Sequence, residues 1–248
     1  HVPFCNELCW YCGCATTITQ NTSRLDAYTD LLLQEIALVG AALRERPEVV
    51  HLHFGGGTPS AIGGAALGRV LQALRDVFPF AADADLVATL AASGINRASL
   101  GVQSFDPRIQ TVINRVQPFD VTSTTATGLR AAGIRGLNLD LIYGLPHQTE
   151  AICRDDARKS LALEPDRLSV FGYAHVPQMR KHQQLLPEEA LPEGLERAEQ
   201  FEAICDELTE AGYVRIGLDH FAHPDDATAK AAATGDLPRN FQSYTTDP

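Results

Sequence analysis

An α/β fold is predicted from the order and composition of the chain's apolar segments. Short apolar strands alternate with helical stretches, which is typical of parallel strands covered by helices. The strands are apolar on both faces, as they are in a barrel that helices surround. The chain has 248 residues, an ordinary length for one such domain. We therefore predict a partial (β/α) barrel of the TIM type, forming one domain over residues 1–248.

The first predicted elements run from a helix to a strand and back to a helix. Ala27–Arg44 carries apolar residues at helical spacing, and Asp26 can cap its first turn. Val49–Phe54 is rich in strand-forming residues and stops at Gly55. Leu67–Phe78 again has the apolar spacing of a helix.

The same alternation continues through the rest of the chain. Gly133, Gly144 and Gly212 each follow an apolar segment and favour its end. The predicted strands in this part are Arg97–Val102, Leu137–Tyr143, Leu168–Tyr173 and Tyr213–Leu218. The predicted helices are Pro107–Asn114, Val121–Ala132, Glu150–Leu163 and Pro192–Ala211.

One strand of the barrel is predicted to be missing. The helix Leu67–Phe78 leads through Pro79–Asp85 directly into a second helical stretch, Leu86–Ala92. A strand and its loop should separate two such helices. We therefore predict an internal deletion near 79–86, which would leave two sheet edges unpaired.

Charge and hydropathy exclude several classes of partner. The formal net charge of −11 argues against nucleic acid, and against an anionic membrane, as the main partner. No run of about eighteen apolar residues is present, so no membrane span is expected. Clustered cysteines without a secretory signal indicate a reducing compartment, the cytoplasm. Because the sequence opens at His1 within a strand-to-loop junction and stops at Pro248, we interpret it as a fragment truncated at both ends.

Four cysteines carry the strongest functional signal. Cys5, Cys9, Cys12 and Cys14 lie within ten residues, in the spacing C-x3-C-x2-C-x-C. Thiolates this close can hold one iron–sulfur cluster, and three ligands on a four-iron cluster leave one iron open to a small molecule. A zinc site usually has two separated cysteine pairs, and a disulfide framework suits a short secreted chain. Zinc therefore stays as a minor alternative, and a disulfide framework is less suitable still.

The ends of the predicted strands supply further candidates, because ligands of α/β barrels bind at the carboxyl ends of the strands. Gly55–Thr58 follows a strand, and its glycines let backbone amides and carbonyls approach a ligand. Gln103 ends another strand, and Arg115 after a short helix can hold a carboxylate. Asp140 lies within an apolar strand, so it needs a ligand such as a ribose hydroxyl or a partner such as Arg135. A simple tight turn and a solvated arginine are the non-functional alternatives.

Histidines and the remaining cysteines are weaker candidates. His51 and His53 alternate along one strand, so both face the same side of the sheet, where packing is favoured over a metal pair. His175 and His220 lie at strand ends and are candidates for a substrate site. The two remaining cysteines fall on helices and are predicted to be small buried hydrophobes: Cys153 and Cys205.

The cysteine spacing resembles that of the radical S-adenosylmethionine superfamily. The resemblance implies a 4Fe-4S cluster held by Cys5, Cys9 and Cys12, with one iron left for the amino and carboxylate groups of S-adenosylmethionine. It also implies that cleavage of the bound sulfonium releases a 5′-deoxyadenosyl radical. Tyr11, just before the third cysteine, resembles the aromatic residue that packs near the adenine, with an ordinary core aromatic as the alternative.

Cys14 and a series of motifs narrow the resemblance to one family. These motifs are HVPFC, HFGGGTPS, LGVQSF, NLDLIYGLP, RLSVFGYAHVP and GLDHFAHP followed by RNFQSYTT. In these motifs, which occur in the same order, the chain is similar to the oxygen-independent coproporphyrinogen III oxidases. By motif match, three residues resemble a binding motif for S-adenosylmethionine: Gly56, Gly57 and Thr58. Four others resemble contacts for a second S-adenosylmethionine: Gln103, Arg115, Asp140 and Ala174.

The resemblance implies a reaction and a set of partners. The reaction is the oxidative decarboxylation of coproporphyrinogen III to protoporphyrinogen IX in haem biosynthesis, begun by hydrogen abstraction from a propionate. The expected partners are coproporphyrinogen III and a small reductant protein of flavodoxin or ferredoxin type, with the chain a monomer. A haem-binding chaperone of the related family is the alternative, although such chaperones usually lack a cysteine where Cys14 stands. An inactive fragment is a further alternative, because the family's acidic contact to S-adenosylmethionine, expected near 79–86, is absent.

Overall fold

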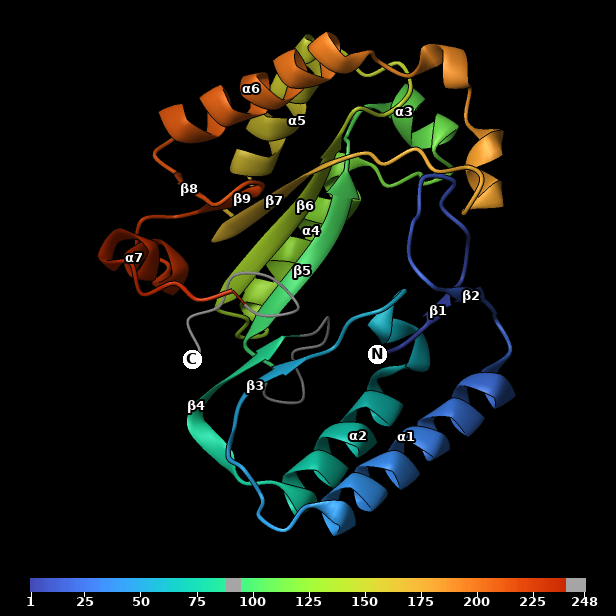
Figure 1. Ribbon diagram of the computed structural model, residues 1–248, viewed down its shortest axis with the longest axis vertical. Coiled ribbons are helices and arrows are strands. Elements are labelled where there is room, and N and C mark those ends of the chain that lie inside the picture. Colours follow the sequence, from blue (N-terminus) through green and yellow to red (C-terminus); the bar gives the residue numbers. More distant parts are fainter. Residues whose placement is uncertain (88–94, 240–248) are drawn as a thin grey trace. The chain divides into compact units, whose positions relative to one another are not determined.

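The computed structural model describes residues 1–87 and 95–239 and divides the chain into two compact units (Figure 1). The first unit comprises His1–Leu8, Cys14–Ala98 and Ala131–Arg135. The second comprises Cys9–Gly13, Ser99–Arg130 and Gly136–Pro248. The cysteine motif is divided between them, because Cys5 and Cys14 belong to the first unit and Cys9 and Cys12 to the second.

The first unit combines two long helices with short parallel strand pairs. Helices α1 and α2 pack against each other along their lengths (Figure 1). Strand β1 pairs in parallel with β2, and β3 pairs in parallel with β4. The bounds of these elements are β1 Phe4–Cys5, β2 Thr17–Ile18, α1 Thr22–Ala42, β3 Val49–His53, the 3₁₀ turn Pro59–Ile62, α2 Gly64–Val77 and β4 Phe80–Val87.

Helix α1 begins earlier than the sequence predicts. Its N-cap is Asn21, whose side chain accepts a hydrogen bond from the Arg24 amide. Asp26, the predicted cap, therefore lies inside the helix. Asn21 is the N-cap because its short side chain reaches the amide three residues further along the chain. This bond satisfies one of the unpaired donors of the first turn.

The predicted loss of a strand is wrong. Strand β4 spans Phe80–Val87, where the sequence predicts a deletion, and it pairs with β3 through His51↔Asp85, Leu52↔Leu86 and His53↔Val87. At its end, Val87 pairs with Arg97 of β5. The sequence Ala82–Asp85 alternates alanine with aspartate, a period of two that is easily missed because both residues are poor strand formers. The rest of the predicted helix Leu86–Ala92 lies outside the described residues.

The second unit contains a sheet with the strand order β5-β6-β7-β9-β8, whose β5 begins in the first unit at Arg97. Strand β7 is parallel to β6 and antiparallel to β9, which in turn is antiparallel to β8. The strands are β5 Arg97–Gln103, β6 Gly136–Tyr143, β7 Arg167–Gly172, β8 Val214–Ile216 and β9 His220–Ala222. The helices are α3 Pro107–Val112, α4 Phe119–Ala131, α5 Glu150–Leu161, α6 Gly194–Glu210 and α7 Ala227–Thr234. Two 3₁₀ turns, Lys181–Leu185 and Glu188–Ala190, lie in the connection from β7 to α6.

The end of this sheet is a hairpin rather than the single predicted strand Tyr213–Leu218. Gly217 has a positive φ of 62°, so the chain turns after β8 and returns as β9. The short helix α7, which the sequence analysis omitted, follows and is capped by the Asp226 side chain.

Only one face of strand β6 is apolar. Leu137, Leu139 and Leu141 of β6 are at most 1% exposed, whereas Asn138 and Asp140 between them project from the other face. The expectation of strands apolar on both faces is therefore wrong for β6. The apolar residues form the core, and the polar face is free to build a site.

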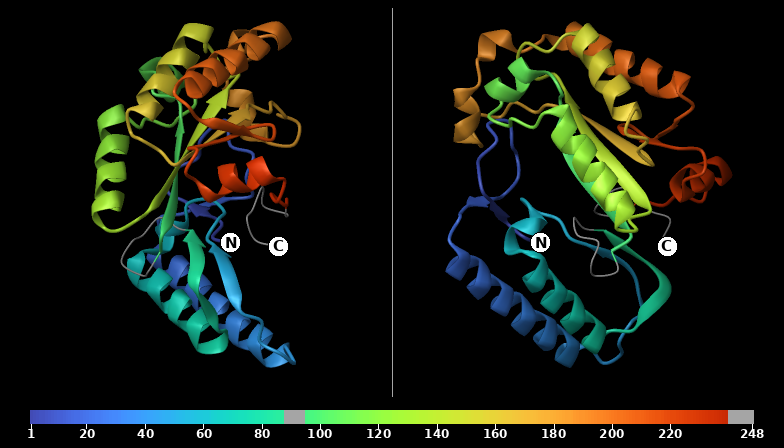
Figure 2. Two further views of the ribbon diagram at one scale, coloured as in Figure 1. Left: turned by 90° about the vertical axis from the view of Figure 1, so that its left-hand side faces the viewer. Right: turned by 180° about the vertical axis from the view of Figure 1, so that it is seen from behind.

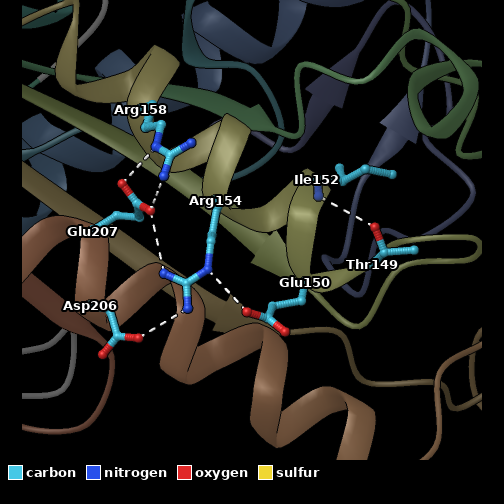
Figure 3. Close-up of polar contacts among 7 residues, drawn as sticks. All are labelled: Thr149, Glu150, Ile152, Arg154, Arg158, Asp206 and Glu207. Atoms are coloured by element: carbon cyan, nitrogen blue, oxygen red, sulfur yellow. Dashed lines mark hydrogen bonds and ion pairs between the residues drawn. The ribbon is translucent and has the colours of Figure 1, made fainter.

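Helices α5 and α6 lie side by side in the second unit and are joined by ion pairs (Figure 2, Figure 3). Arg154 contacts Glu150 of its own helix at 3.0 Å, and it reaches Asp206 and Glu207 of α6 at 3.1 and 3.3 Å. Arg158 donates twice to the Glu207 carboxylate, which lowers the pKa of Glu207. Within the described residues, no helix is long and apolar enough to cross a membrane.

Candidate active site

In the first unit, the glycine-rich turn runs beside the N-terminal segment that carries Cys5. The Val2 amide donates to the Gly55 carbonyl at 2.7 Å, and the Gly57 amide donates back to the Val2 carbonyl at 2.9 Å. The Thr58 amide donates to the Phe4 carbonyl at 2.7 Å. The amides of Gly57 and Thr58 are therefore used inside the protein, and the carbonyls of the turn are the better groups to meet a ligand.

Close backbone contact explains why glycine is needed in this turn. A Cβ at Gly56, whose φ is 131°, would lie 2.4 Å from the Val2 carbonyl oxygen. A Cβ at Gly57 would lie 2.7 Å from the Cys5 sulfur. No side chain fits at either position without moving the backbone. The Thr58 hydroxyl donates to the same Cys5 sulfur at 3.4 Å, so the turn also supplies a donor to the thiol.

In the second unit, Arg115 reaches Cys9 from the end of α3. Its Nη1 donates to the Cys9 sulfur at 3.6 Å, and its Nη2 donates to the Gly101 carbonyl at 2.6 Å and to Gln117 at 3.2 Å. The side chain is partly buried, so the alternative of a solvated arginine is wrong. The Arg115 guanidinium therefore lies directly beside the Cys9 sulfur.

Gln103 lies beside the same arginine at the end of β5. A Cβ on Gly101 would lie 2.7 Å from the Gln103 amide nitrogen and 3.2 Å from Arg115 Nη2, so both side chains occupy the space over this glycine. Gln103 has a positive φ of 69° and is buried. For a non-glycine residue, such a conformation costs on the order of 1 kcal/mol and is held by its surroundings.

Asp140 on β6 receives hydrogen bonds from neutral donors. Asn138 Nδ2 donates to Oδ1 at 2.7 Å, and the Ser99 hydroxyl donates to Oδ2 at 3.1 Å. Burial raises the pKa of Asp140, while the bonds from Ser99, Asn138 and Ser169 and the nearby His220 lower it. Neutral donors thus bond the carboxylate of Asp140. The sequence analysis names Arg135 as a possible partner for it.

Tyr11 and Ala174 are joined through a third residue. Gln183 Nε2 donates to the Tyr11 carbonyl at 3.0 Å and to the Ala174 carbonyl at 3.1 Å. The Tyr11 ring packs with Trp10 against a buried apolar cluster that includes Ile113. Burial raises the pKa of the Tyr11 hydroxyl, with Arg115 opposing and Cys9 and Cys12 adding to this shift.

The remaining candidate histidines contact neighbouring side chains, and the two cysteines on helices are buried. The rings of His51 and His53 stack with centroids 6.4 Å apart, as expected for one face of a strand. His175 lies 2.8 Å from the Tyr173 hydroxyl, and His220 lies 2.7 Å from Asp219. Cys153 and Cys205 are buried on α5 and α6, as predicted. Among the residues that the structure describes, no three His, Cys, Asp or Glu side chains are grouped to hold a metal ion.

Sequence reasoning missed three polar residues of this region: Ser99, Asn138 and Gln183. A signal existed for Asn138, which alternates with Asp140 on one face of an apolar strand. Gln183 lies in a 3₁₀ turn without any period in the sequence, so only the fold could reveal it.

The described residues suit thiolate ligands of an iron–sulfur cluster. All six cysteines are free thiols, and Cys5, Cys9 and Cys12 are partly exposed. Cys5 and Cys9 each receive a hydrogen bond, from Thr58 and Arg115 respectively. The missing side chain at Gly57 leaves room next to the Cys5 sulfur.

A comparison with protein families decides the membership of the chain. The model described as the radical SAM superfamily matches residues 1–159. The chain belongs to the radical SAM superfamily. Solved structures agree with this fold. The Escherichia coli coproporphyrinogen III oxidase, described as a radical SAM enzyme, superposes with a TM-score of 0.95. That match has 38% identity and covers all of this chain and 60% of the other. Streptococcus suis SuiB, at 14% identity and a TM-score of 0.51 over 85% of this chain and 45% of the other, is similar in fold alone.

Within the superfamily, the chain is similar to named relatives. It is 52% identical to the oxygen-independent coproporphyrinogen III oxidase of Bradyrhizobium diazoefficiens, over all of this chain and 58% of the relative. It is 40% identical to the enzyme of that name from Synechocystis sp., over all of this chain and 56% of the relative. The chain thus spans less than two thirds of these relatives. The first alignment runs over 260 positions against 248 residues here, so the relative has at least twelve residues without a counterpart in this radical SAM chain.

Proposed function

We propose that the protein to which this chain belongs converts coproporphyrinogen III to protoporphyrinogen IX by oxidative decarboxylation in haem biosynthesis. The observation that carries the proposal is the 52% identity to an oxygen-independent coproporphyrinogen III oxidase over the whole chain. The donors that reach the sulfurs of Cys5 and Cys9 add independent chemical support.

In this proposal, Cys5, Cys9 and Cys12 hold a 4Fe-4S cluster and leave one iron for S-adenosylmethionine. When bound, the cluster and S-adenosylmethionine supply the radical chemistry that removes hydrogen from a propionate, after which carbon dioxide and an electron leave. Thr58 and Arg115 donate hydrogen bonds to the sulfurs of Cys5 and Cys9 and hold these ligands in place.

The remaining predicted residues bind and orient the ligands. We assign the carbonyls of Gly56 and Gly57 to the ammonium of S-adenosylmethionine, because the amides of Gly57 and Thr58 bond Val2 and Phe4. Tyr11 packs near its adenine. A second S-adenosylmethionine is held by Gln103, Arg115, Asp140 and Ala174. The Asp140 carboxylate suits ribose hydroxyls, because donors from the protein already fix both of its oxygens.

The proposal extends to the fold and the partners. The parallel pairs β3–β4 and β6–β7 and the helices between strands support a partial (β/α) barrel as one core domain. The twelve or more residues of the relative without a counterpart here support the predicted internal deletion near 79–86, although the strand β4, Phe80–Val87, is present there. A small reductant protein of flavodoxin or ferredoxin type supplies the electrons. The protein is a monomer. It works in a reducing compartment such as the cytoplasm, which keeps the thiols free.

Anaerobic reconstitution of the full-length protein tests this function. After iron and sulfide are loaded, dithionite, S-adenosylmethionine and coproporphyrinogen III should give 5′-deoxyadenosine and protoporphyrinogen IX. Binding of haem without turnover would support the chaperone alternative instead. A chain that holds only zinc would contradict both.

A further inference from the structure

Gln183 is a buried side chain with every bond directed at backbone, and it lies in the long connection between β7 and α6. Its exposed fraction is 0%. Nε2 donates to the carbonyls of Tyr11 and Ala174, and Oε1 accepts from the Val176 amide at 2.6 Å. One amide thus fastens three backbone positions in two separate segments. Its full hydrogen-bonding pattern makes the geometry specific, because a buried polar group without partners is costly.

The two segments that Gln183 joins are those that the proposed site requires. Tyr11 lies between Cys9 and Cys12, so the position of its carbonyl fixes the path of the loop between two ligands. Ala174 follows β7 and offers only backbone to a ligand. The side chain therefore sets the spacing between the cysteine loop and the end of β7.

Neighbouring contacts hold the same loop but do not reach Ala174. His182 Nε2 donates to the Cys12 carbonyl at 2.7 Å, since a carbonyl can only accept. The Trp10 amide donates to the Ile113 carbonyl at 2.9 Å. These bonds would keep the loop folded after loss of Gln183, while its spacing from Ala174 would relax.

We propose that Gln183 is a positioning residue, which couples the loop carrying Cys9 and Cys12 to the backbone of Ala174 and so aligns the cluster with bound S-adenosylmethionine. This inference rests on the proposed function. Gln183 touches neither the cluster nor the substrate in this account, because all of its polar atoms are occupied by backbone groups.

Gln200 provides a matched control on α6. It is 2% exposed, its Oε1 accepts from the Gly144 amide at 2.9 Å, and its Nε2 donates to the Gln148 carbonyl at 2.8 Å. It is thus a buried glutamine that bridges backbone segments but has no bond to the cysteine loop. Gln200→Met and Gln183→Met both remove a buried bridging amide and keep most of its volume.

The test uses the reconstituted full-length protein and compares both variants with the wild type. We measure the iron and sulfide per chain, the melting temperature and the Kd for S-adenosylmethionine. We also record the electron paramagnetic resonance spectrum of the reduced cluster with and without S-adenosylmethionine. We expect both variants to melt at lower temperature. Only Gln183→Met should lose the spectral change that S-adenosylmethionine induces and bind it about tenfold more weakly, which corresponds to about one lost hydrogen bond.

Two results would overturn the inference while leaving the proposed function intact. Gln183→Met could match the wild type in spectrum and Kd, or Gln200→Met could lose both properties equally. If Gln183→Met does not fold, Gln183→Glu keeps the acceptor for the Val176 amide while removing the two N–H donors, and the same loss is expected. A wild-type protein without a cluster or without a response to S-adenosylmethionine would overturn the function as well.

Discussion

Single thiols are the first place where the proposed function can be tested. We expect Cys5→Ala, Cys9→Ala and Cys12→Ala each to abolish the iron–sulfur absorbance and the formation of 5′-deoxyadenosine together, because three thiolates are the minimum that holds the cluster. Cys14→Ser should keep the iron content of the wild type. Visible absorbance and iron analysis after anaerobic loading check both. A full four-iron spectrum in any of the three alanine variants would refute the ligand assignment.

Asp140 gives a prediction about pH. Burial raises the pKa of Asp140, and the bonds from Ser99 and Asn138 counter that rise, with Ser169 and His220 as the other groups that face it. Ser99→Ala removes one donor, so the pKa should rise further and S-adenosylmethionine binding should fail at a higher pH on the acid side. Isothermal titration between about pH 5 and 8 measures the shift.

The control for Asp140 is Ser99→Thr, which retains the hydroxyl. It should leave the acid limb of binding where the wild type has it. An alanine variant with an unshifted limb would show that ligand binding does not depend on an ionised Asp140.

Asp156 on α5 predicts a dependence of stability on pH. Its Oδ1 accepts from the Phe105 amide at 2.6 Å, and within the described part of the chain its Oδ2 has no hydrogen-bond partner. Burial raises the pKa of Asp156 to about 7, and the Phe105 amide only partly opposes this. The folded state therefore holds its proton longer than the unfolded state, and stability falls as pH rises from about 4 to 7.

The size of this effect is measurable by urea unfolding. A shift of about three pKa units corresponds to roughly 4 kcal/mol at most. We expect Asp156→Asn to lose this part of the pH dependence, because asparagine keeps the acceptor for Phe105 without the charge. Asp225→Asn, whose side chain is 86% exposed, is the control and should behave as the wild type. Parallel pH profiles for wild type and Asp156→Asn would contradict the prediction.

At the residue scale, the motifs supplied most of the candidate residues. They selected Cys9 for the cluster and Arg115 for a second S-adenosylmethionine, and in the structure the Arg115 Nη1 lies 3.6 Å from the Cys9 sulfur. The motifs could not predict Ser99 or Gln183. Ser99 bonds a residue 41 positions away and Gln183 a residue 172 positions away, and such distant bonds leave no local pattern in the chain. Such residues are defined by the fold, so sequence reasoning reaches them only after the strand order is known.

At the scale of elements, the ion pair of Arg167 on β7 with Asp226 at the start of α7 joins two elements of the second unit. The guanidinium Nη2 lies 2.9 Å from the carboxylate. Burial would raise the pKa of Asp226, but Arg167 and the bonds from Thr228 outweigh it and lower the pKa to about 2. This stability is present above about pH 4 and is lost as pH falls through 2.

Replacing this carboxylate should remove that contribution. We expect Asp226→Asn to lower the free energy of unfolding at pH 7 by roughly 2 kcal/mol, the value of the lost pKa shift. The difference from wild type should shrink as the pH approaches 2. Asp225→Asn, whose side chain is 86% exposed, serves as the matched control. Equal effects of both substitutions in chemical denaturation would rule out the ion pair as the cause.

Element prediction succeeded where the period was strong and failed where alanine, aspartate or short length hid it. The long apolar strands β5, β6 and β7 appear within a residue or two of their expected bounds. Strand β4 was mistaken for a gap, and the short β9 was merged with β8. Three-residue strands bury too little apolar surface to leave a period, and pairing across the sheet stabilises them instead.

At the scale of the whole molecule, the net charge of this chain opposes the proposed substrate. The chain carries −11, and coproporphyrinogen bears four propionates. Like charges slow association, and salt screens them within a Debye length of about 10 Å at 0.1 M. We therefore expect kcat/KM of the complete enzyme to rise with ionic strength between about 10 and 150 mM. Steady-state kinetics at fixed pH would check this. A fall in kcat/KM with ionic strength would show that basic residues near the site attract the propionates more strongly than the net charge repels them.

The burial of Cys153 and Cys205 has a practical consequence for anyone who handles this protein. Their side chains are at most 7% exposed, and burial raises the pKa of Cys205 to about 11 and that of Cys153 further. Alkylating reagents attack thiolates, so these two sulfurs should stay silent until the chain denatures. For this chain, a native maleimide count therefore reports the four motif sulfurs, and under the proposed ligand assignment it should drop from four to one once the cluster is bound. The number of thiols that react with maleimide therefore measures cofactor occupancy without an activity assay.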